Sequence, residues 1–278
     1  MADPCEQKLQ GPRRRSLAVT RHRFIFFDAN HQAVFPIVKK ETAGAISLYG
    51  TGFFVAPGGV FASAKHVFEG ADIHESESFH ILQEAADHVE PRRITEVVVD
   101  AASDLAVGRL DPAHGECVFC EAHPVVGIME LDPEIHEVVG SYTFSHTLID
   151  QPEDIGVEQK VGAGQRVLYR AHWEVGTAEA IHPNGLGFVK GCCFSSSILV
   201  EGRASGGPVF NSNGFVVGVN SRSFTKTGGL PHSTASSIKR LYDIEIGGRS
   251  IRNWRRGVKN DRIAYRTSID QKAENRPD

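Results

Sequence analysis

The sequence contains no apolar run that approaches the roughly 18 residues needed to cross a bilayer. Even the stretch from Ile25 to Val38 is interrupted by four polar residues: Asp28, Asn30, His31 and Gln32. The arginines at 13–15 are followed by a segment that lacks the apolar core of a secretion signal, which has about 7 to 15 residues. We therefore expect a cytoplasmic protein that makes no contact with a membrane.

The sequence also has little excess charge of either sign. It carries 30 Lys and Arg against 34 Asp and Glu, which gives a net charge of -4. This balance argues against a nucleic-acid partner, which would call for a basic surface. The apolar share of 41% and the charged share of 23% are ordinary for globular proteins, so neither disorder nor a fibrous repeat is indicated.

Cysteines are few, and their number of five is odd. Cys192 and Cys193 are adjacent, a spacing that rarely forms a relaxed disulfide, so we expect reduced thiols. One segment offers four zinc-type ligands three residues apart. Its spacing is too tight for the usual paired arrangement and apolar residues are interleaved, so structural thiols and surface histidines are favoured, with no metal or cofactor. The four residues are His114, Cys117, Cys120 and His123.

Short strand-like runs separated by Gly, Pro and Asn turns dominate from about residue 33 to 225. This pattern predicts a mostly β fold of the barrel or sandwich kind rather than βαβ units. Turns at 56–59 and 211–214 mark two hairpins, whose second strands are expected at 60–63 and 215–219. Further strands are expected at 45–49, 52–55, 97–99, 105–110, 138–144, 167–173 and 208–210.

The segment 111–137 is rich in Pro, His and acidic residues and has weak periodicity, which predicts a linker near residue 125. The expected organisation is a basic extension at 1–22, one unit at 23–125, a second at 126–246 and a basic tail at 247–278. Near the end of the second unit, helical spacing puts three apolar side chains on one face, which predicts a short packing helix. They are Ile238, Leu241 and Tyr242.

The tail is the most basic part of the chain, and its composition favours a solvated extension. Docking to a nucleic acid or an acidic partner is the alternative. Its basic residues are Arg249, Arg252, Arg255, Arg256, Lys259 and Arg262, with Trp254, Ile263 and Tyr265 among them.

Ser205 stands between Ala204 and two glycines followed by Pro208, directly before a predicted strand. Glycines beside a reactive serine let the backbone bend sharply and let a substrate carbonyl approach. A serine hydroxyl is a weak nucleophile unless a base takes its proton. His66 and Asp104 are the candidates for base and orienting acid, because His66 closes a strand of small residues and Asp104 opens an apolar strand.

Three segments in this order resemble the trypsin/chymotrypsin-like peptidase family, particularly its bacterial trypsin-like domains. They are Ser63-Ala64-Lys65-His66, Asp104-Leu105-Ala106 and Ser205-Gly206-Gly207-Pro208. Residues 50–55 and 138–142 are also similar to family strands, so the match extends over about residues 40 to 225. Together the three motifs are specific, whereas one alone would not be.

The resemblance implies a double six-stranded antiparallel β-barrel with the site between the barrels. His66 would be general base and then general acid, Asp104 its orienter, and Ser205 the acylated nucleophile, with the backbone N–H groups of Arg203 and Ser205 forming the oxyanion hole. An α/β-hydrolase is excluded by residue order, because that fold needs glycine two positions before the nucleophile and its histidine after the acid.

The chain departs from the family beside the serine. Arg203 stands where the family has glycine, and Ala204 replaces the aspartate that pairs with a new N-terminus in secreted zymogens, which argues against that activation route. The family's pocket floor falls on Leu199 and its wall on Val219, Asn220 and Ser221. Since Leu199 is not acidic, a small or apolar substrate side chain is expected, unless Leu199 merely packs in the barrel.

These observations predict a serine endopeptidase whose partner is a protein or peptide substrate. One alternative is a protease-fold module in which Arg203 spoils the oxyanion hole, so that peptides are bound and not cut. Another is an effector protease that a regulatory partner controls through the basic tail.

Overall fold

The computed structural model describes residues 33–40, 46–69, 79–84, 89–111, 125–149, 159–161, 165–168, 170–225 and 231–256. The zinc-type cluster at 114–123 and the extension at 1–22 lie outside these residues. No helix in the described ranges is long and apolar enough to span a membrane.

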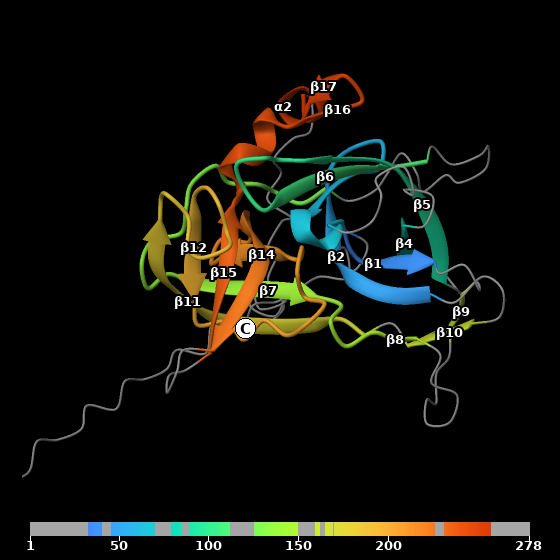
Figure 1. Cartoon of the computed structure of the whole chain (residues 1–278), viewed down its shortest axis with the longest axis horizontal. Helices are drawn as coiled ribbons and strands as arrows, with labels where there is room; N and C mark the ends of the chain where they lie inside the picture. Colours follow the sequence, from blue (N-terminus) through green and yellow to red (C-terminus); the bar gives the residue numbers. More distant parts are fainter. Residues whose placement is uncertain are drawn as a thin grey trace, which may run out of the picture.

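Six antiparallel strands close the first barrel, in the order β1-β2-β3-β6-β5-β4. Figure 1 shows this barrel in blue to green. The strand β3 and most of β6 are buried, and they contact β14 and β16 respectively. The strands are β1 (Val34–Lys40), β2 (Ile46–Ala56), β3 (Val60–Ala64), β4 (Phe79–Glu84), β5 (Val89–Val99) and β6 (Leu105–Leu110).

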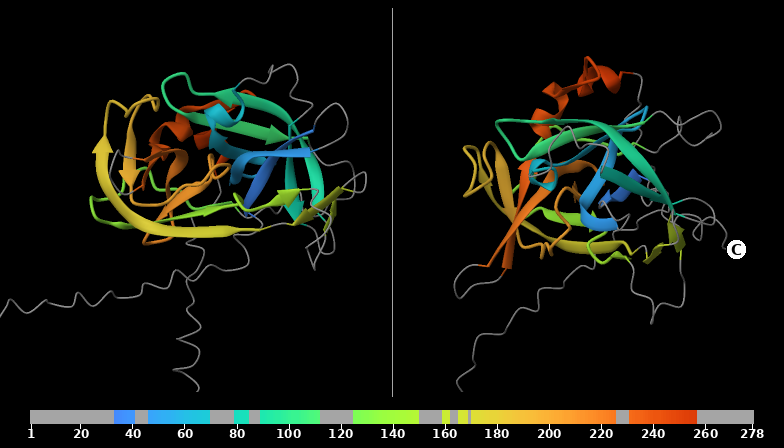
Figure 2. Two further views of the ribbon diagram at one scale, coloured as in Figure 1. Left: turned by 60° about the horizontal axis from the view of Figure 1, so that its bottom comes forward. Right: turned by 45° about the vertical axis from the view of Figure 1, so that its right-hand side comes forward.

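Six more strands close the second barrel, in the order β11-β12-β15-β14-β13-β7. The two barrels lie side by side in all the views of Figures 1 and 2. The expected fold, mostly β with two six-stranded antiparallel barrels, is therefore confirmed. The strands are β7 (Val138–Thr143), β11 (His172–His182), β12 (Cys193–Ser196), β13 (Pro208–Asn211), β14 (Val216–Thr225) and β15 (Pro231–Ser237).

A small third sheet holds β8 (Leu148–Ile149), β9 (Gln159–Val161) and β10 (Gln165–Leu168). The sequence predicted one strand at 167–173, and this is wrong. Residues 165–168 pair with β8 and β9, whereas β11 begins at His172 and pairs with β7. The chain therefore passes from one sheet to another within residues 167–173, which the sequence predicts as a single strand.

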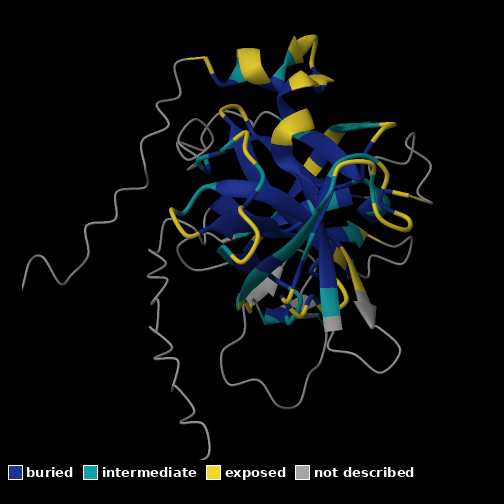
Figure 3. Ribbon diagram, turned by 90° about the vertical axis from the view of Figure 1, so that its left-hand side faces the viewer, coloured by how far each residue is buried: buried dark blue, intermediate teal, exposed yellow. Residues whose placement is uncertain are grey.

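The core is continuous between the barrels. One buried cluster joins side chains of the first barrel, such as Phe54 and Phe61, to Val126 of the connecting segment and to Phe210 of the second barrel. Figure 3 shows this buried interior in dark blue. The described part of the predicted linker, from residue 125, is not a loose tether, because Met129 N–H donates to Val216 O at 3.0 Å. Burial of this shared core fixes the barrels against each other.

The expected C-terminal packing helix is a 3-10 helix, η4 (Ile238–Asp243), and its three predicted apolar side chains are buried. The sheet of β16 (Glu245–Ile246) and β17 (Arg249–Ser250) follows, and then α2 (Ile251–Trp254). In Figure 1 these last elements lie over β6 of the first barrel.

The prediction of a solvated extension is wrong for Ile251 and Arg255, whereas Arg249, Arg252 and Arg256 are exposed. Ile251 is fully buried, and Arg255 is 7% exposed. The Arg255 guanidinium donates to Val126 O at 3.2 Å and also to Val55 O. Burial lowers the pKa of Arg255, and nearby Tyr242 opposes this effect. The segment is basic in composition, but one of its arginines is a buried link between the first barrel and the connecting segment. The rest of the tail lies outside the described residues.

Candidate functional site

His66 and Asp104 meet because of the pairing of β3 with β6. Ala64 lies opposite Leu105, so the residue after β3 faces the residue before β6. His66 then lies in the 3-10 helix η1 (Lys65–Val67), whose first N–H donates to Asp104 O at 3.1 Å. The register of one antiparallel pair therefore places the imidazole beside the carboxylate.

Asp104 accepts hydrogen bonds on both carboxylate oxygens. Its Oδ2 lies 2.7 Å from His66 Nδ1, and its Oδ1 accepts from the His66 backbone N–H at 3.1 Å. The Ser221 hydroxyl also donates to Oδ2. Since a carboxylate can only accept, Nδ1 of His66 carries the proton and Nε2 is left as the acceptor. Burial by itself would raise the pKa of Asp104, but the hydrogen bonds and charge of His66 and the Ser221 hydroxyl lower it overall.

Ser205 lies in the turn before β13 and is half-buried. Its hydroxyl donates to Ser221 O at 3.1 Å. Ser221 therefore contacts both the serine, through its carbonyl, and Asp104, through its hydroxyl. A nucleophile activated by His66 would donate this hydroxyl hydrogen bond to Nε2 in place of the Ser221 carbonyl.

The turn around Ser205 is held by backbone hydrogen bonds on both sides. Gly206 N–H donates to Asn220 O at 2.8 Å, and Asn220 N–H donates to Gly207 O at 2.8 Å. Gly206 has φ 87°, and a Cβ there would lie 2.2 Å from Thr51 O. Only glycine fits this position without displacing backbone of the first barrel.

Arg203 has φ 73°, in the left-handed region that disfavours a residue with a Cβ. In the part of the chain that the structure describes, the N–H groups of Arg203 and Ser205 donate to no backbone or side-chain acceptor. Two such N–H groups, two residues apart at a serine, can donate hydrogen bonds to an oxygen that develops negative charge.

A family model described as a trypsin-like peptidase domain matches residues 50–219, more than half of the chain. The chain belongs to the trypsin-like peptidase family. No curated protein sequence matches it.

Solved structures share the fold of this trypsin-like domain at low sequence identity. The crystal structure of Deg5 has a TM-score of 0.53 and 17% identity, and the match covers 77% of this chain and 88% of that one. An HtrA-type protease, AlgW, with a tripeptide has a TM-score of 0.52, 18% identity and coverage of 77% and 59%. The MamO protease domain from Magnetospirillum magneticum has a TM-score of 0.53, 12% identity and coverage of 80% and 100%.

The residues expected to bind substrate lie in different surroundings in this trypsin-like domain. Leu199 is 44% exposed, whereas Val219 and Asn220 are buried. Asn220 donates to Ser141 Oγ from its side chain. Ser221 is buried against Asp104. Of the four, only Leu199 exposes a large part of its side chain.

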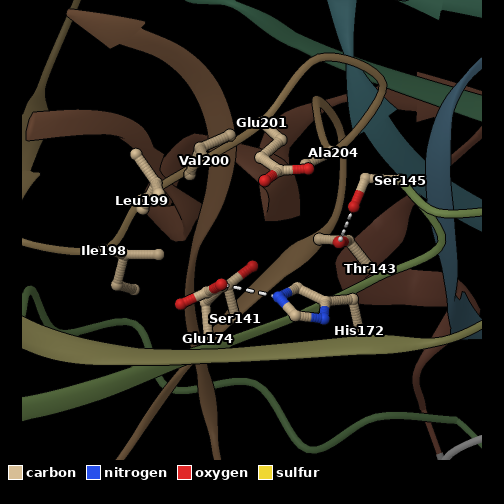
Figure 4. A pocket seen from close by; sticks show the side chains of 10 residues that line it. All are labelled: Ser141, Thr143, Ser145, His172, Glu174, Ile198, Leu199, Val200, Glu201 and Ala204. Atoms are coloured by element: carbon tan, nitrogen blue, oxygen red, sulfur yellow. Dashed lines mark hydrogen bonds and ion pairs between the residues drawn. The ribbon is translucent and has the colours of Figure 1, made fainter. Parts of the chain in front are cut away.

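Leu199 lines a small hollow, open to solvent, between the segment before Ser205 and the strands β7 and β11. Figure 4 shows the segment 198–201 above and His172 and Glu174 below. His172 Nε2 lies 2.6 Å from Glu174 Oε1, and His146 Nε2 lies 3.1 Å from Glu201 Oε2. The two carboxylates of the hollow are thus each paired with a histidine.

Two residues of the site were missed from the sequence. Ser221 was assigned to a pocket wall, and its hydroxyl contact with Asp104 spans 117 positions in the chain. Thr51 has no predicted role and falls only within residues 50–55, which resemble a family strand. One sequence feature could have pointed to Thr51. It is a polar residue between two glycines at the start of an apolar stretch, and a hydroxyl buried there needs hydrogen-bond partners.

Proposed function

We propose that this chain is a serine endopeptidase that hydrolyses peptide bonds through His66, Asp104 and Ser205. The observation that carries the proposal is the 2.7 Å contact between His66 Nδ1 and Asp104 Oδ2 in a site that also holds Ser205 through Ser221. Membership of the trypsin-like peptidase family supports it. No cofactor takes part in this chemistry.

In the proposed reaction, Ser205 Oγ attacks the peptide carbonyl carbon while His66 Nε2 takes the hydroxyl proton. The N–H groups of Arg203 and Ser205 bind the oxyanion, and Asp104 stabilises the imidazolium. His66 then returns the proton to the amine nitrogen as the C–N bond breaks, which leaves the acyl group on Ser205. Water then attacks the acyl carbon while His66 Nε2 takes its proton, and the carboxylic acid leaves as the proton returns to Ser205 Oγ.

We propose a small or apolar side chain before the cleaved bond. Leu199 offers an exposed apolar surface next to the Ser205 turn. Glu174 Oε1 and Glu201 Oε2 lie 2.6 Å and 3.1 Å from the Nε2 atoms of His172 and His146, and each histidine competes with a basic substrate side chain for its carboxylate. Cleavage of a peptide library tests this preference, and a dominant preference for lysine or arginine would contradict it.

Fluorophosphonate labelling combined with peptide cleavage tests the nucleophile. Ser205→Ala should take no label and should lose about a thousandfold or more in turnover, because the oxyanion donors cannot replace the nucleophile. Ser212→Ala is the matched control, since the hydroxyl of this exposed residue donates to Glu137 and makes no other hydrogen bond to the residues that the structure describes. It should label like the wild-type protein. Persistent cleavage by Ser205→Ala would refute the assignment.

A peptide-binding module that does not cleave is the second candidate. It is favoured by the Ser205 hydroxyl, which donates to Ser221 O. This candidate predicts that the folded wild-type protein binds library peptides, takes no fluorophosphonate label and releases no product. A labelled, active wild-type protein would exclude it.

A further inference from the structure

Arg203 adopts a backbone conformation that its own side chain disfavours. Its φ of 73° is left-handed, and His136 is the other non-glycine residue with positive φ in the described ranges. The arginine is exposed, so no burial of its side chain holds it there. Ala204 N–H donates to Glu201 O at 3.2 Å, so Arg203 is the third residue of a β-turn, a position that takes positive φ and usually holds glycine.

Besides this local hydrogen bond, the turn is contacted by Thr51, a fully buried residue of β2 in the other barrel. Its hydroxyl donates to Arg203 O at 3.3 Å, and its backbone N–H donates to Ser205 O at 2.9 Å. These two contacts hold the carbonyls on either side of Ala204. The flanking Gly50 allows this approach, because a Cβ there would lie 2.9 Å from Ser205 O.

Thr51 is itself held in place by two further hydrogen bonds. Phe144 N–H donates to the Thr51 hydroxyl at 3.3 Å, and the Ser63 hydroxyl donates to Thr51 O at 2.8 Å. With an amide donor on one side, the hydroxyl proton points to Arg203 O. The Thr51 side chain is therefore oriented before the turn meets a substrate.

We propose that Thr51 is a positioning residue for the oxyanion hole, an inference that rests on the proposed function. Its hydroxyl keeps the Arg203–Ala204 peptide oriented so that Arg203 stays left-handed and its N–H stays directed to the oxyanion. Without the hydroxyl, Arg203 relaxes and its N–H turns away. Ser205 keeps its place, because the backbone N–H of Thr51 still bonds to its carbonyl.

Kinetics of Thr51→Val and Thr51→Ser test this role. Both hydroxyl contacts are long for hydrogen bonds. Loss of the restraint should therefore cost about tenfold in kcat, less than the roughly hundredfold or more for outright removal of an oxyanion donor. KM should stay within about twofold, since the donor acts in the transition state. Thr51→Ser should stay within about threefold of the wild-type kcat.

Two further variants separate positioning from a general loss of packing. Thr234→Val is the control, because this buried hydroxyl in β15 has no hydrogen-bond partner in the structure as described. It should keep the wild-type kcat. Arg203→Gly added to Thr51→Val should recover most of the lost kcat, because glycine accepts a left-handed φ without strain. Equal loss in Thr51→Val and Thr51→Ser, or no recovery with Arg203→Gly, would overturn the role.

A crystal structure of Thr51→Val decides the inference independently of activity. Negative φ at Arg203 supports it, whereas an unchanged left-handed Arg203 overturns it. If the wild-type protein neither cleaves nor labels, the proposed function fails on that result, and the φ at Arg203 still reports on Thr51 as the restraint of the turn.

Discussion

Replacing Gly206 by alanine would perturb the contact between the Ser205 turn and the first barrel. The left-handed φ of 87° alone costs an alanine about 1–2 kcal/mol. The added Cβ would lie 2.1 Å from Ser63 Oγ and 2.2 Å from Thr51 O, so it would also break the 2.8 Å hydrogen bond between them, at about 1 kcal/mol. Displacement of backbone adds a further 1–2 kcal/mol, about what overpacking costs. The total is about 3–5 kcal/mol.

Urea unfolding and thermal unfolding measure this loss, and a decrease in Tm of about 5 to 9 °C is expected for a chain of this size. Gly202→Ala is the matched control in the same turn, because a Cβ there meets no atom within 4 Å. It should change the free energy of unfolding by less than about 0.5 kcal/mol. If Gly206→Ala were as stable as Gly202→Ala, the approach of the turn to β2 would be wrong.

Three other predictions concern single residues. Asp104→Asn should lower kcat by about 10³ to 10⁴ because His66 loses its oriented tautomer. Since the folded pKa of Asp104 is lowered, its stabilisation is present above its ordinary pKa and is lost as pH falls through the folded value, so the stability gap between wild type and variant should narrow in acid. Arg255→Met should cost about 2–3 kcal/mol in urea unfolding through unsatisfied buried carbonyls, whereas exposed Arg256→Met should cost under about 0.5. Burial and neighbouring Cys192 raise the pKa of Cys193 to about 11, so peptide mapping after iodoacetamide at pH 8 should find it modified only when unfolded.

Much of the fold could be predicted from local pattern. The strand at 105–110 coincides with β6, and the turn at 56–59 joins β2 to β3. These segments can be recognised in the sequence because their apolar runs are bounded by turn residues such as glycine and proline. The split between β10 and β11 could not be predicted in this way. It depends on which partner strand each half finds, and periodicity does not report pairing partners.

The residues of the candidate site also fall into those that local sequence pattern predicts and those that it does not. His66 and Asp104 could be chosen because each lies at the end of a strand beside recognisable neighbours. The roles of Ser221 and Thr51 depend on contacts 117 and 152 positions apart in the chain, which arise only when the two barrels pack together. Arg255 was misassigned for a related reason, because composition marks it as basic and only its position in the fold makes it buried.

The same packing places a condition on the proposed catalysis. His66, Asp104 and Thr51 belong to the first barrel, whereas Arg203, Ser205 and Ser221 belong to the second. The link between Asp104 and Ser205 passes through Ser221, and the restraint on Arg203 passes through Thr51, so both cross from one barrel to the other. Hydrogen bonds weaken steeply with poor geometry. A small shift of one barrel against the other would therefore disturb the base and the oxyanion donors together, although each barrel stayed folded.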